Sequence, residues 1–393
     1  MEATNPKKKV FCGDMAIWRL FFCLTFFSLV GVFSATNTLA YQSENILDPF
    51  ARHATFLLGG ALLVLGLAHT PYKYFKLAII LLPVSIALLV YAACKGININ
   101  KAARWISLFG VEFQPSEFGK LACVIFVAFW LSMRRLFPER IIYKIILWGV
   151  GSTFFLIMIY NLSTAILLCA VSFLMLIIGQ ISIARLLKLL CVLAILGTAV
   201  ICMPEKTVQE YLPRASTWQS RIKQWLIPDN ETVQSSDEDY QITLSKAAIA
   251  SGGLLGKGPG GGEQRNYLPQ IFTDFIYAAI IEDWGILFGG LGVFLLYVIL
   301  MIRTGIIARK CDKLFPRYLV IGCGLMISMQ AFIHMAVNLD LFPVTGLPLP
   351  LISRGGTSTI LTCAYIGIIL SVSHFGVNEK NTDESKEESI ATV

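Results

Sequence analysis

Long apolar runs dominate this 393-residue chain and limit what it can fold into. Hydrophobic residues make up 56% of the sequence and charged residues 15%, whereas a soluble domain carries about 25% charged residues. An apolar run of roughly 17–25 residues is long enough to cross a bilayer as a helix. About ten runs qualify: residues 15–35, 54–70, 74–94, 117–133, 141–159, 162–180, 184–203, 275–302, 317–337 and 350–373. The sequence therefore predicts an all-α, polytopic membrane protein with about ten transmembrane helices and one long outer loop.

Lysine and arginine residues gather in alternate loops of this series. The basic side carries Lys7, Lys8, Lys9, Lys73, Lys76, Arg134, Arg135, Arg140, Arg185, Lys188, Arg303, Arg309, Lys310, Lys313 and Arg317. The short loops of the other side are poor in both residues, apart from Lys95, Lys101 and Arg104. The positive-inside rule then places both termini in the cytoplasm. The net charge of +7 is largely this bias, so it gives no reason to expect a nucleic-acid partner.

The predicted organisation follows from the spans. Residues 1–14 form a cytoplasmic N-terminus, residues 15–374 the ten-helix domain, and residues 375–393 a polar, acidic tail that we expect to be disordered. Residues 204–274 form the long extracytoplasmic loop, with a short amphipathic helix predicted around residues 218–226, where Trp and aliphatic residues recur at helical spacing. A second helix is expected from Tyr240 to Ala250, followed by a glycine-rich stretch.

The glycine-rich stretch, residues 251–265, allows two interpretations. It is a flexible hinge, or its backbone approaches a ligand closely and its amides cradle a phosphate. It is not a P-loop, because Ser251 stands where the first glycine is needed and Gly258 where a Ser or Thr is needed.

A single acidic residue, Asp274, stands where this polar loop ends and the next apolar run begins. It is either the N-cap of the following helix or a carboxylate placed for chemistry at the membrane–water boundary. Two turns further on, Glu282 and Asp283 fall within the apolar run. This acidic pair must face protein or water; it is either paired with a basic residue or part of a transport path.

Three more segments contain candidate functional residues. In residues 114–120, Ser116 is predicted as an N-cap and Glu117 pairs with Lys120, or else Arg104 and Lys120 approach an anionic ligand group. Residues 342–358 are dense in Pro and Gly, which predicts irregular backbone buried against protein, as at transporter binding sites. Residues 160–165 form a short turn, read as an N-capped helix start.

The His and Cys residues give no sequence signal for a metal site or a redox pair. The four histidines and ten cysteines show no pair at metal-ligand or redox spacing.

Taken together, four of these segments resemble a known family. Gln-Pro-Ser-Glu-Phe with Lys120, the glycine-rich loop before Thr-Asp-Phe-Ile, Pro-Val-Thr-Gly-Leu-Pro-Leu-Pro and the following Ser-x-Gly-Gly are similar to the SEDS proteins of bacterial cell shape, division and sporulation (FtsW, RodA, SpoVE). The resemblance covers about residues 34–374. The end of the loop, Gln264-Arg265, is more similar to the FtsW, division-type branch than to the RodA branch.

The resemblance implies a peptidoglycan glycosyltransferase that polymerises lipid II at the outer face of the bacterial cytoplasmic membrane. It makes Asp274 the catalytic residue. The substrate-binding candidates are Arg104, Gln114, Glu117, Lys120, Lys257, Arg265, Thr345, Arg354 and Ser358. The implied partners are lipid II, a class B penicillin-binding protein and other division or elongation proteins. The alternatives are a lipid II flippase and a non-catalytic scaffold for a penicillin-binding protein.

This chain departs from the family pattern at several positions, and four of these departures change a charged or ring side chain. Asn161 and Gln270 replace carboxylates, Phe272 replaces a histidine, and Arg354 replaces an aromatic residue. The first three changes remove groups that could bind a metal, so the Mg²⁺ or Mn²⁺ that the family suggests is less expected here, and no metal ligand is assigned. Arg354 adds a positive charge at the same time.

Overall fold

The computed structural model describes residues 10–34, 48–99, 102–108, 111–202, 218, 219, 221, 225, 237–264 and 273–377. Its main helices are α1 (Met15–Ser34), α3 (Asp48–Ala68), α4 (Leu81–Lys95, preceded by the 3₁₀ helix Tyr72–Ile80), α5 (Pro115–Ser132), α6 (Glu139–Met158), α7 (Leu162–Ile178), α8 (Ile183–Cys202), α13 (Val293–Lys310), α14 (Leu314–Asn338) and α15 (Thr357–Ser371). The described residues also include helices α11 (Asp237–Gly252) and α12 (Ile276–Gly285), with short 3₁₀ or π-helical turns at Met133–Arg135, Ile286–Gly292 and Val372–Gly376.

Every apolar run predicted to cross the membrane coincides with a helix. Within the described residues, eight helical spans are long and apolar enough to do so by length and composition, and α7 is a shorter apolar helix of 10–17 residues. The all-α polytopic fold is thereby confirmed. The helix predicted over residues 240–250 is confirmed as α11. The amphipathic helix around residue 218 falls largely outside the described residues, as do residues 1–9 and the tail beyond residue 377.

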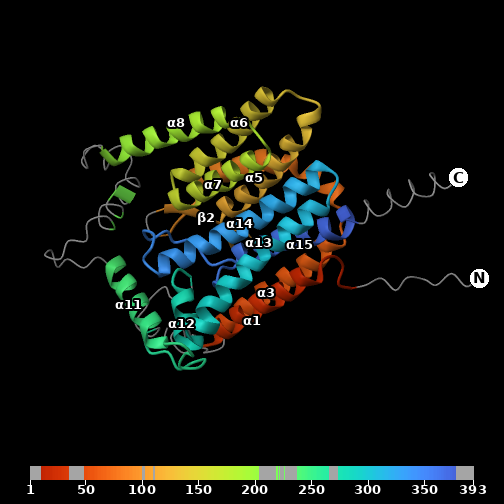
Figure 1. Ribbon diagram of the computed structural model, residues 1–393. Coiled ribbons are helices and arrows are strands. Elements are labelled where there is room, and N and C mark those ends of the chain that lie inside the picture. The colour runs from red at the N-terminus through yellow and green to blue at the C-terminus, as the bar shows by residue number, and fades with distance from the viewer. Residues whose placement is uncertain are drawn as a thin grey trace, which may run out of the picture.

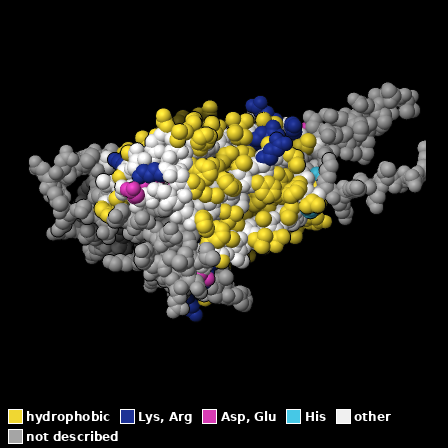
Figure 2. All heavy atoms as spheres, turned by 90° about the horizontal axis from the view of Figure 1, so that it is seen from below, with side chains coloured by type: hydrophobic (Ala, Val, Ile, Leu, Met, Phe, Trp, Pro, Cys, Tyr) yellow, Lys and Arg dark blue, Asp and Glu magenta, His cyan; other side chains and the backbone are white. Residues whose placement is uncertain are grey.

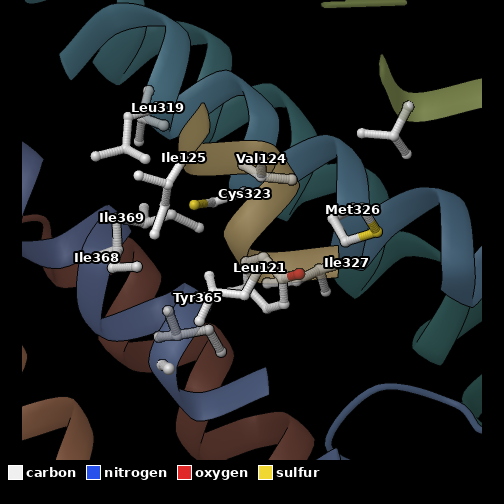
Figure 3. Packing of buried hydrophobic residues seen from close by; sticks show 14 of the residues in the cluster. Leu121, Val124, Ile125, Leu319, Cys323, Met326, Ile327, Tyr365, Ile368 and Ile369 are labelled. Carbon is white, nitrogen blue, oxygen red and sulfur yellow. The ribbon is translucent and has the colours of Figure 1, made fainter. Parts of the chain in front are cut away.

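Three helices form the centre of the bundle. About 70% of the apolar windows of α5, α14 and α15 is buried, compared with 22% for α3 and α4. Figure 3 shows how Val124 and Ile125 of α5 meet Leu319 and Cys323 of α14, with Ile369 of α15 beside them. The peripheral helices therefore present their exposed apolar side chains outward, which is the arrangement expected of lipid-facing helices.

Close approach of α3 to α15 depends on two glycines. A Cβ placed on Gly60 of α3 would lie 2.5 Å from Cys363 Sγ, and one on Gly367 of α15 would lie 2.7 Å from Leu67 Cβ. Small residues at such contacts let helix backbones approach closely in membranes, where van der Waals packing drives association.

Both ends of the described chain meet at one end of the bundle. Asp14, just before α1, accepts a hydrogen bond from Arg303 Nη2 at 2.6 Å, and its amide donates to Ser373 Oγ at 2.9 Å. We call this the Asp14 end. Figure 2 shows a broad band of hydrophobic side chains across the molecule, with Lys and Arg side chains on both sides of it.

The opposite end carries α11, α12 and a small sheet, and we call it the Asp274 end (Figure 1). Strands β1 (Ile97–Ile99), β2 (Ala102–Leu108) and β3 (Val111–Phe113) pair antiparallel in the order β1-β2-β3. Ile106 pairs with Phe113 and Ser107 with Glu112, while a bulge interrupts the β1–β2 register between Ile97 and Asn98. This sheet was not predicted, because strands of three residues give too little alternation to read in a sequence.

Two predicted helix limits need correction. Residues 350–356 are not helical; α15 begins only at Thr357, after the positive-φ residue Gly356. The apolar run from residue 275 is also interrupted, since Gly285 adopts φ 76° and ψ 172° between α12 and the π-helical turn Ile286–Gly292. Only a glycine enters this conformation at low cost, so α12 ends there and a second helical segment continues into α13.

Candidate active site at the Asp274 end

Asp274 lies one residue before the cap of α12. The N-cap of α12 is Phe275, which has no side-chain cap bond, so the interpretation of Asp274 as an N-cap is wrong. Asn338 Nδ2, at the end of α14, donates to the Asp274 carbonyl at 3.1 Å, and Ser353 Oγ donates to the Thr273 carbonyl at 2.8 Å. The backbone on both sides of the Cα atom is therefore fixed by other elements.

The Asp274 carboxyl group lies against the turn at Gly346. A Cβ placed on Gly346 would be 3.6 Å from Asp274 Oδ2, and Gly346 has φ 61° and is exposed. Asp274 itself is half-buried. The carboxylate thus stands on a fixed backbone, beside the exposed Gly346, on a residue that is itself only partly buried.

The segment from Pro343 to Ser353 is irregular, as predicted. Six of its backbone carbonyl groups accept hydrogen bonds from side chains of other elements. The donors are Arg221 Nη1 to Val344, Ser163 Oγ to Thr345, His334 Nδ1 to Leu347, Gln330 Nε2 to Pro348, Tyr297 OH to Pro350 and Ser28 Oγ to Ile352, at 2.5–3.1 Å. Non-helical backbone at membrane depth requires such partners, since no water is present to replace them. The surrounding helices thereby fix the path of the turn that meets Asp274.

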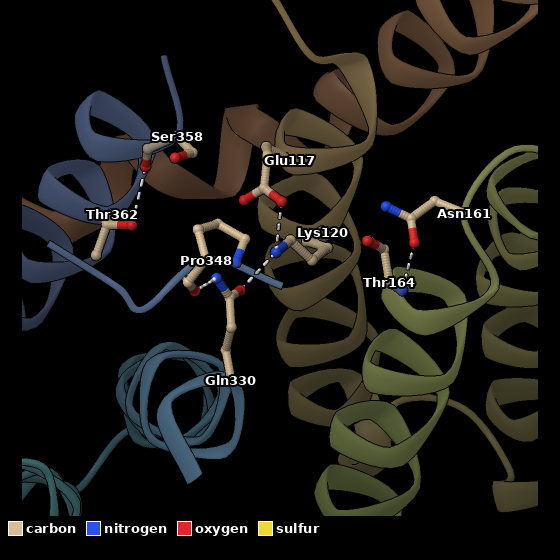
Figure 4. A network of polar contacts seen from close by, with 8 residues as sticks. All are labelled: Glu117, Lys120, Asn161, Thr164, Gln330, Pro348, Ser358 and Thr362. Atoms are coloured by element: carbon tan, nitrogen blue, oxygen red, sulfur yellow. Dashed lines mark hydrogen bonds and ion pairs between the residues drawn. The ribbon is translucent and has the colours of Figure 1, made fainter. Parts of the chain in front are cut away.

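A buried ion pair supports this segment from below (Figure 4). Lys120 Nζ lies 2.8 Å from Glu117 Oε1 and donates to Gln330 Oε1 at 2.6 Å, and Gln330 in turn donates to Pro348. Lys120 is 1% and Glu117 4% exposed. The pairing predicted from their spacing is confirmed, and in this structure the two charges and Gln330 connect α5, α14 and the Pro-rich segment.

Gln114 and Asn161, far apart in sequence, line one small cavity of about 20 Å³ together with Ser116 and Tyr160. Asn161 caps α7 by accepting the Thr164 amide at 3.2 Å, so the N-cap interpretation of this turn is confirmed. The assignment of Ser116 as N-cap is wrong: Gln114 is the cap of α5, Pro115 takes the first helical position, and Ser116 Oγ has no hydrogen-bond partner among the described residues.

Arg354 adds positive charge at this end of the bundle. Burial and the nearby Arg52 lower the pKa of the Arg354 guanidinium, while the nearby Asp48 opposes the shift. An arginine remains charged despite such a shift. Ser358, the second residue of α15, donates its amide to the Gly355 carbonyl at 2.8 Å. Two arginines and the beginning of a helix therefore come together, a combination that favours anionic groups.

The glycine-rich loop is bound to α12 rather than open to a ligand. Glu282 Oε1 accepts the amides of Glu263 and Gln264 at 2.9 and 3.2 Å, and Lys257 Nζ lies 3.6 Å from it. The amides of Lys257 and Gly258 donate to the carbonyls of Glu282 and Asp283. The amides of the loop and Lys257 therefore contact α12, two turns beyond Asp274. Of the two roles that the sequence allowed for the acidic pair, this placement supports pairing with a basic residue.

The side chains of two predicted site residues lie outside the described part of the structure. Arg104 lies in β2, but its side chain falls outside the described part, and Arg265 lies in residues 265–272, which also contain Gln270 and Phe272. Within the described residues, no three His, Cys, Asp or Glu side chains come together as a metal site.

Several residues of the site were missed by sequence reasoning. Asn338, Ser353, Gln330, His334 and Arg52 are single polar residues in or beside apolar runs. Such residues are costly in a membrane and mark function or structural pairing. The sequence shows these isolated polar residues, but it does not show which partner each of them contacts in the fold.

Comparison with known proteins supports the resemblance. The family model described as cell cycle protein, FtsW/RodA/SpoVE, matches residues 14–378. A probable peptidoglycan glycosyltransferase FtsW of Trichlorobacter lovleyi is 31% identical, over 92% of this chain and 93% of that protein. One of the same description from Haemophilus influenzae is 32% identical, over 92% and 90%.

A solved structure gives the same result for the fold. It is described as "Structural coordination of polymerization and crosslinking by a peptidoglycan synthase complex", and it matches with a TM-score of 0.74 at 25% identity, covering 92% of this chain and 97% of the other. The family match, which extends over nearly the whole chain, includes Lys120, Asp274 and the Pro-rich segment. This chain belongs to the FtsW/RodA/SpoVE family of polytopic membrane proteins.

Proposed function

We propose that this protein is a peptidoglycan glycosyltransferase of the FtsW type, which polymerises lipid II at the outer face of the cytoplasmic membrane with Asp274 as its general base. One observation carries the proposal: the Asp274 carboxyl group lies beside the exposed Gly346, on a backbone fixed by Asn338 and Ser353. The FtsW names of the relatives support the division-type branch.

The reaction joins two lipid-linked saccharides. The 4-hydroxyl group of the acceptor sugar attacks the anomeric carbon of the donor, and the bond to the polyprenyl pyrophosphate breaks. A sugar alcohol is a weak nucleophile, so a carboxylate within hydrogen-bond reach of the hydroxyl takes its proton as the new bond forms. Two observations support this role for Asp274: the residue is only partly buried, beside the exposed Gly346, and its main chain is held by α14 and the Pro-rich segment.

The departing pyrophosphate gathers negative charge. Positive charge placed beforehand where this charge develops lowers the barrier. Arg354, with Arg52 near it, supplies such charge in the described part of this end. Lys257, in contrast, lies near Glu282, and Lys120 near Glu117, so we assign both lysines to holding the structure around the site.

No observation favours the flippase alternative. That alternative relied on Glu282 and Asp283 as acidic residues along a transport path. Glu282 is instead fully buried and accepts two loop amides, and Asp283 Oδ2 accepts a hydrogen bond from Ser34 Oγ at 2.5 Å. The scaffold alternative makes no use of the accessible carboxylate, and it differs in what it predicts for Asp274.

The test is polymerisation of purified lipid II by the full-length protein and by Asp274→Asn. We expect a loss of about 100-fold or more, the range for removing a general base. Asp340→Asn is the matched control, since Asp340 lies at the same end, pairs with Lys246 and has a φ of 57° that Asn tolerates. Normal glycan chains from Asp274→Asn would refute the proposal. Lipid II transport across liposomes without polymer would favour the flippase.

The assembly and location belong to the same proposal. The matched synthase complex couples polymerization and crosslinking, and we propose that this protein likewise works with a class B penicillin-binding protein and other division proteins. The Asp14 end carries Arg303, Arg309, Lys310 and Arg317, so the positive-inside rule places that end, with both termini, in the cytoplasm. Lipid II then meets Asp274 on the outer side.

A requirement for Mg²⁺ or Mn²⁺ rests on the family resemblance alone. The polymerisation assay with purified protein, repeated with each cation and with a chelator, measures that requirement directly. The assay is to be run with and without a cognate transpeptidase, because activity that depends on the partner would otherwise be read as a lack of activity.

A further inference from the structure

The start of α12 does not carry its own cap. The first amides of a helix have no partner within it, and a polar residue at the cap position normally accepts the amide of the second or third helical residue. Here the cap position is occupied by Phe275, whose side chain makes no such bond. The helix proper begins at Ile276, so its third residue is Ala278.

Asn338, the last residue of α14, supplies the missing cap from another helix. Its Oδ1 atom accepts the Ala278 amide at 3.2 Å, which is the third-position contact that a capping Asn makes in its own helix. The same amide also lies 3.1 Å from the Phe275 carbonyl, and an N–H shared between two acceptors is common at helix ends. The first turn of α12 is therefore tied to α14.

The other half of the Asn338 amide group contacts Asp274. Nδ2 donates to the Asp274 carbonyl at 3.1 Å and to the His334 carbonyl, one turn back in α14, at 2.9 Å. A side-chain amide offers two N–H donors and one acceptor oxygen, so these contacts engage both donors and the oxygen. The partners also determine which way the amide points, since two carbonyls require its nitrogen and a main-chain amide requires its oxygen. Asn338 is fully buried.

These contacts place α14 on both sides of the Asp274 carboxyl group. Asn338 holds the carbonyl of Asp274 and the amide of Ala278, which bracket the entry of the chain into α12. One turn earlier, His334 Nδ1 lies 2.7 Å from the Leu347 carbonyl, next to the turn at Gly346. The direction of the Asp274 side chain relative to that turn therefore depends on the Asn338 side chain.

We propose that Asn338 is a positioning residue for polymerisation. It does not touch substrate; it holds Asp274 and the first turn of α12 in the orientation in which the carboxylate takes the proton. This inference rests on the proposed role of Asp274 as general base. A base acts only within hydrogen-bond reach of the proton, and a misplacement of about 1 Å can lower the rate about 100-fold.

A purely structural role for Asn338 makes a different prediction, and Ser245 provides the matched control. Ser245 Oγ, from α11, donates to the Asn338 carbonyl at 3.1 Å, and Ser245 is also buried. Ser245→Ala therefore removes a buried hydrogen bond to the same residue without changing the side-chain amide that contacts Asp274 and α12. If Asn338 only stabilised the fold, the two residues would give the same kind of defect.

The first measurement separates kcat from KM in polymerisation of purified lipid II by the full-length protein. Asn338→Ala should lower kcat by about 10- to 100-fold and leave KM within about twofold. Ser245→Ala should leave both unchanged. Unchanged kcat in Asn338→Ala, or an equal loss in Ser245→Ala, would overturn the proposal.

A second variant covers a failure of Asn338→Ala to fold. Asn338→Ser keeps a hydroxyl group that can bond to the His334 carbonyl one turn back, but its side chain is one bond shorter and loses the contacts with Asp274 and Ala278. It should show the same loss of kcat with a melting temperature close to that of Ser245→Ala. Loss of folding in both Asn338 variants would assign the residue to stability alone and overturn the proposal.

The double variant Asn338→Ala with Asp274→Asn tests whether one residue acts through the other. We expect its residual rate to equal that of Asp274→Asn alone, because a positioning residue has no effect once the base is gone. A further tenfold loss would overturn the proposal. A normal rate in Asp274→Asn would instead refute the proposed function itself.

Hydrogen exchange measures the cap without any polymerisation. The first turn of α12 should exchange faster in Asn338→Ala than in Ser245→Ala, because the Ala278 amide loses an acceptor. Unchanged exchange in that turn would overturn the proposal whatever the activity of Asp274→Asn.

Discussion

The buried pair of Lys120 and Glu117 illustrates how a membrane protein keeps charge within its centre. Each charge is nearly inaccessible and is bonded to the other, and Lys120 also bonds to Gln330. Removing one member of such a pair leaves the other uncompensated, which costs far more than removing both.

We therefore predict that Lys120→Met lowers the free energy of unfolding by about 3–5 kcal/mol. The double variant Lys120→Met with Glu117→Gln should recover most of that loss, since no buried charge remains. Thermal or denaturant unfolding of purified protein in detergent measures both. A double variant as unstable as the sum of the two single variants would contradict this account.

Glu282 is a second residue whose role is positional. Its Oε1 atom accepts the amides of Glu263 and Gln264 and lies near the Lys257 ammonium group, while Oε2 has no hydrogen-bond partner among the described residues. Glu282→Gln removes the negative charge and leaves a neutral amide oxygen, which is a weaker acceptor for these donors. We expect faster hydrogen exchange at residues 257–264.

The matched control for Glu282→Gln is Glu263→Gln, because the Glu263 residue is exposed and contributes its amide rather than its carboxyl group. Unchanged exchange in Glu282→Gln would show that the loop is held by its other contacts alone. Polymerisation should fall less than in Asp274→Asn, because Glu282 holds a loop and does not react.

At the scale of elements, the pairing of α3 with α15 depends on two positions without a Cβ. A side chain at Gly60 would meet Cys363 at 2.5 Å. Gly60→Leu should force the helices apart and lower the free energy of unfolding by about 1–3 kcal/mol, the usual cost of overpacking. Gly59→Leu, next to it on the same helix, meets no atom within 4 Å of its Cβ and should be neutral. Equal melting temperatures for both variants would contradict this packing.

The helices of this protein were predictable because each carries its own signal. A run of apolar residues crosses the membrane whatever its neighbours are. The sheet β1–β3 and the break at Gly285 were not predictable in this way. The first depends on pairing between strands of three to seven residues, and the second on a loop that hydrogen-bonds across the chain to residues 286 and 287.

At the scale of the whole molecule, the two ends of the bundle differ in chemistry. The Asp274 end combines an accessible carboxylate, two arginines and an irregular segment whose carbonyls are bonded to helices. The Asp14 end combines basic residues with an apolar cavity. Asp274 could be selected from the sequence through the family resemblance. Its neighbours Asn338, Gly346 and Ser353 could not, because they lie 64 to 79 residues further along the chain (338 − 274 = 64 and 353 − 274 = 79).

The central claim is that Asp274 acts on bound substrate as a base rather than helping to bind it. The most direct measurement compares lipid II affinity with the polymerisation rate in Asp274→Asn, using the full-length protein in one membrane mimetic. The account predicts an affinity within about twofold of the unmodified protein and a polymerisation rate lower by about 100-fold or more. A polymerisation rate within tenfold of the unmodified protein, or a loss that weaker binding fully explains, would contradict it.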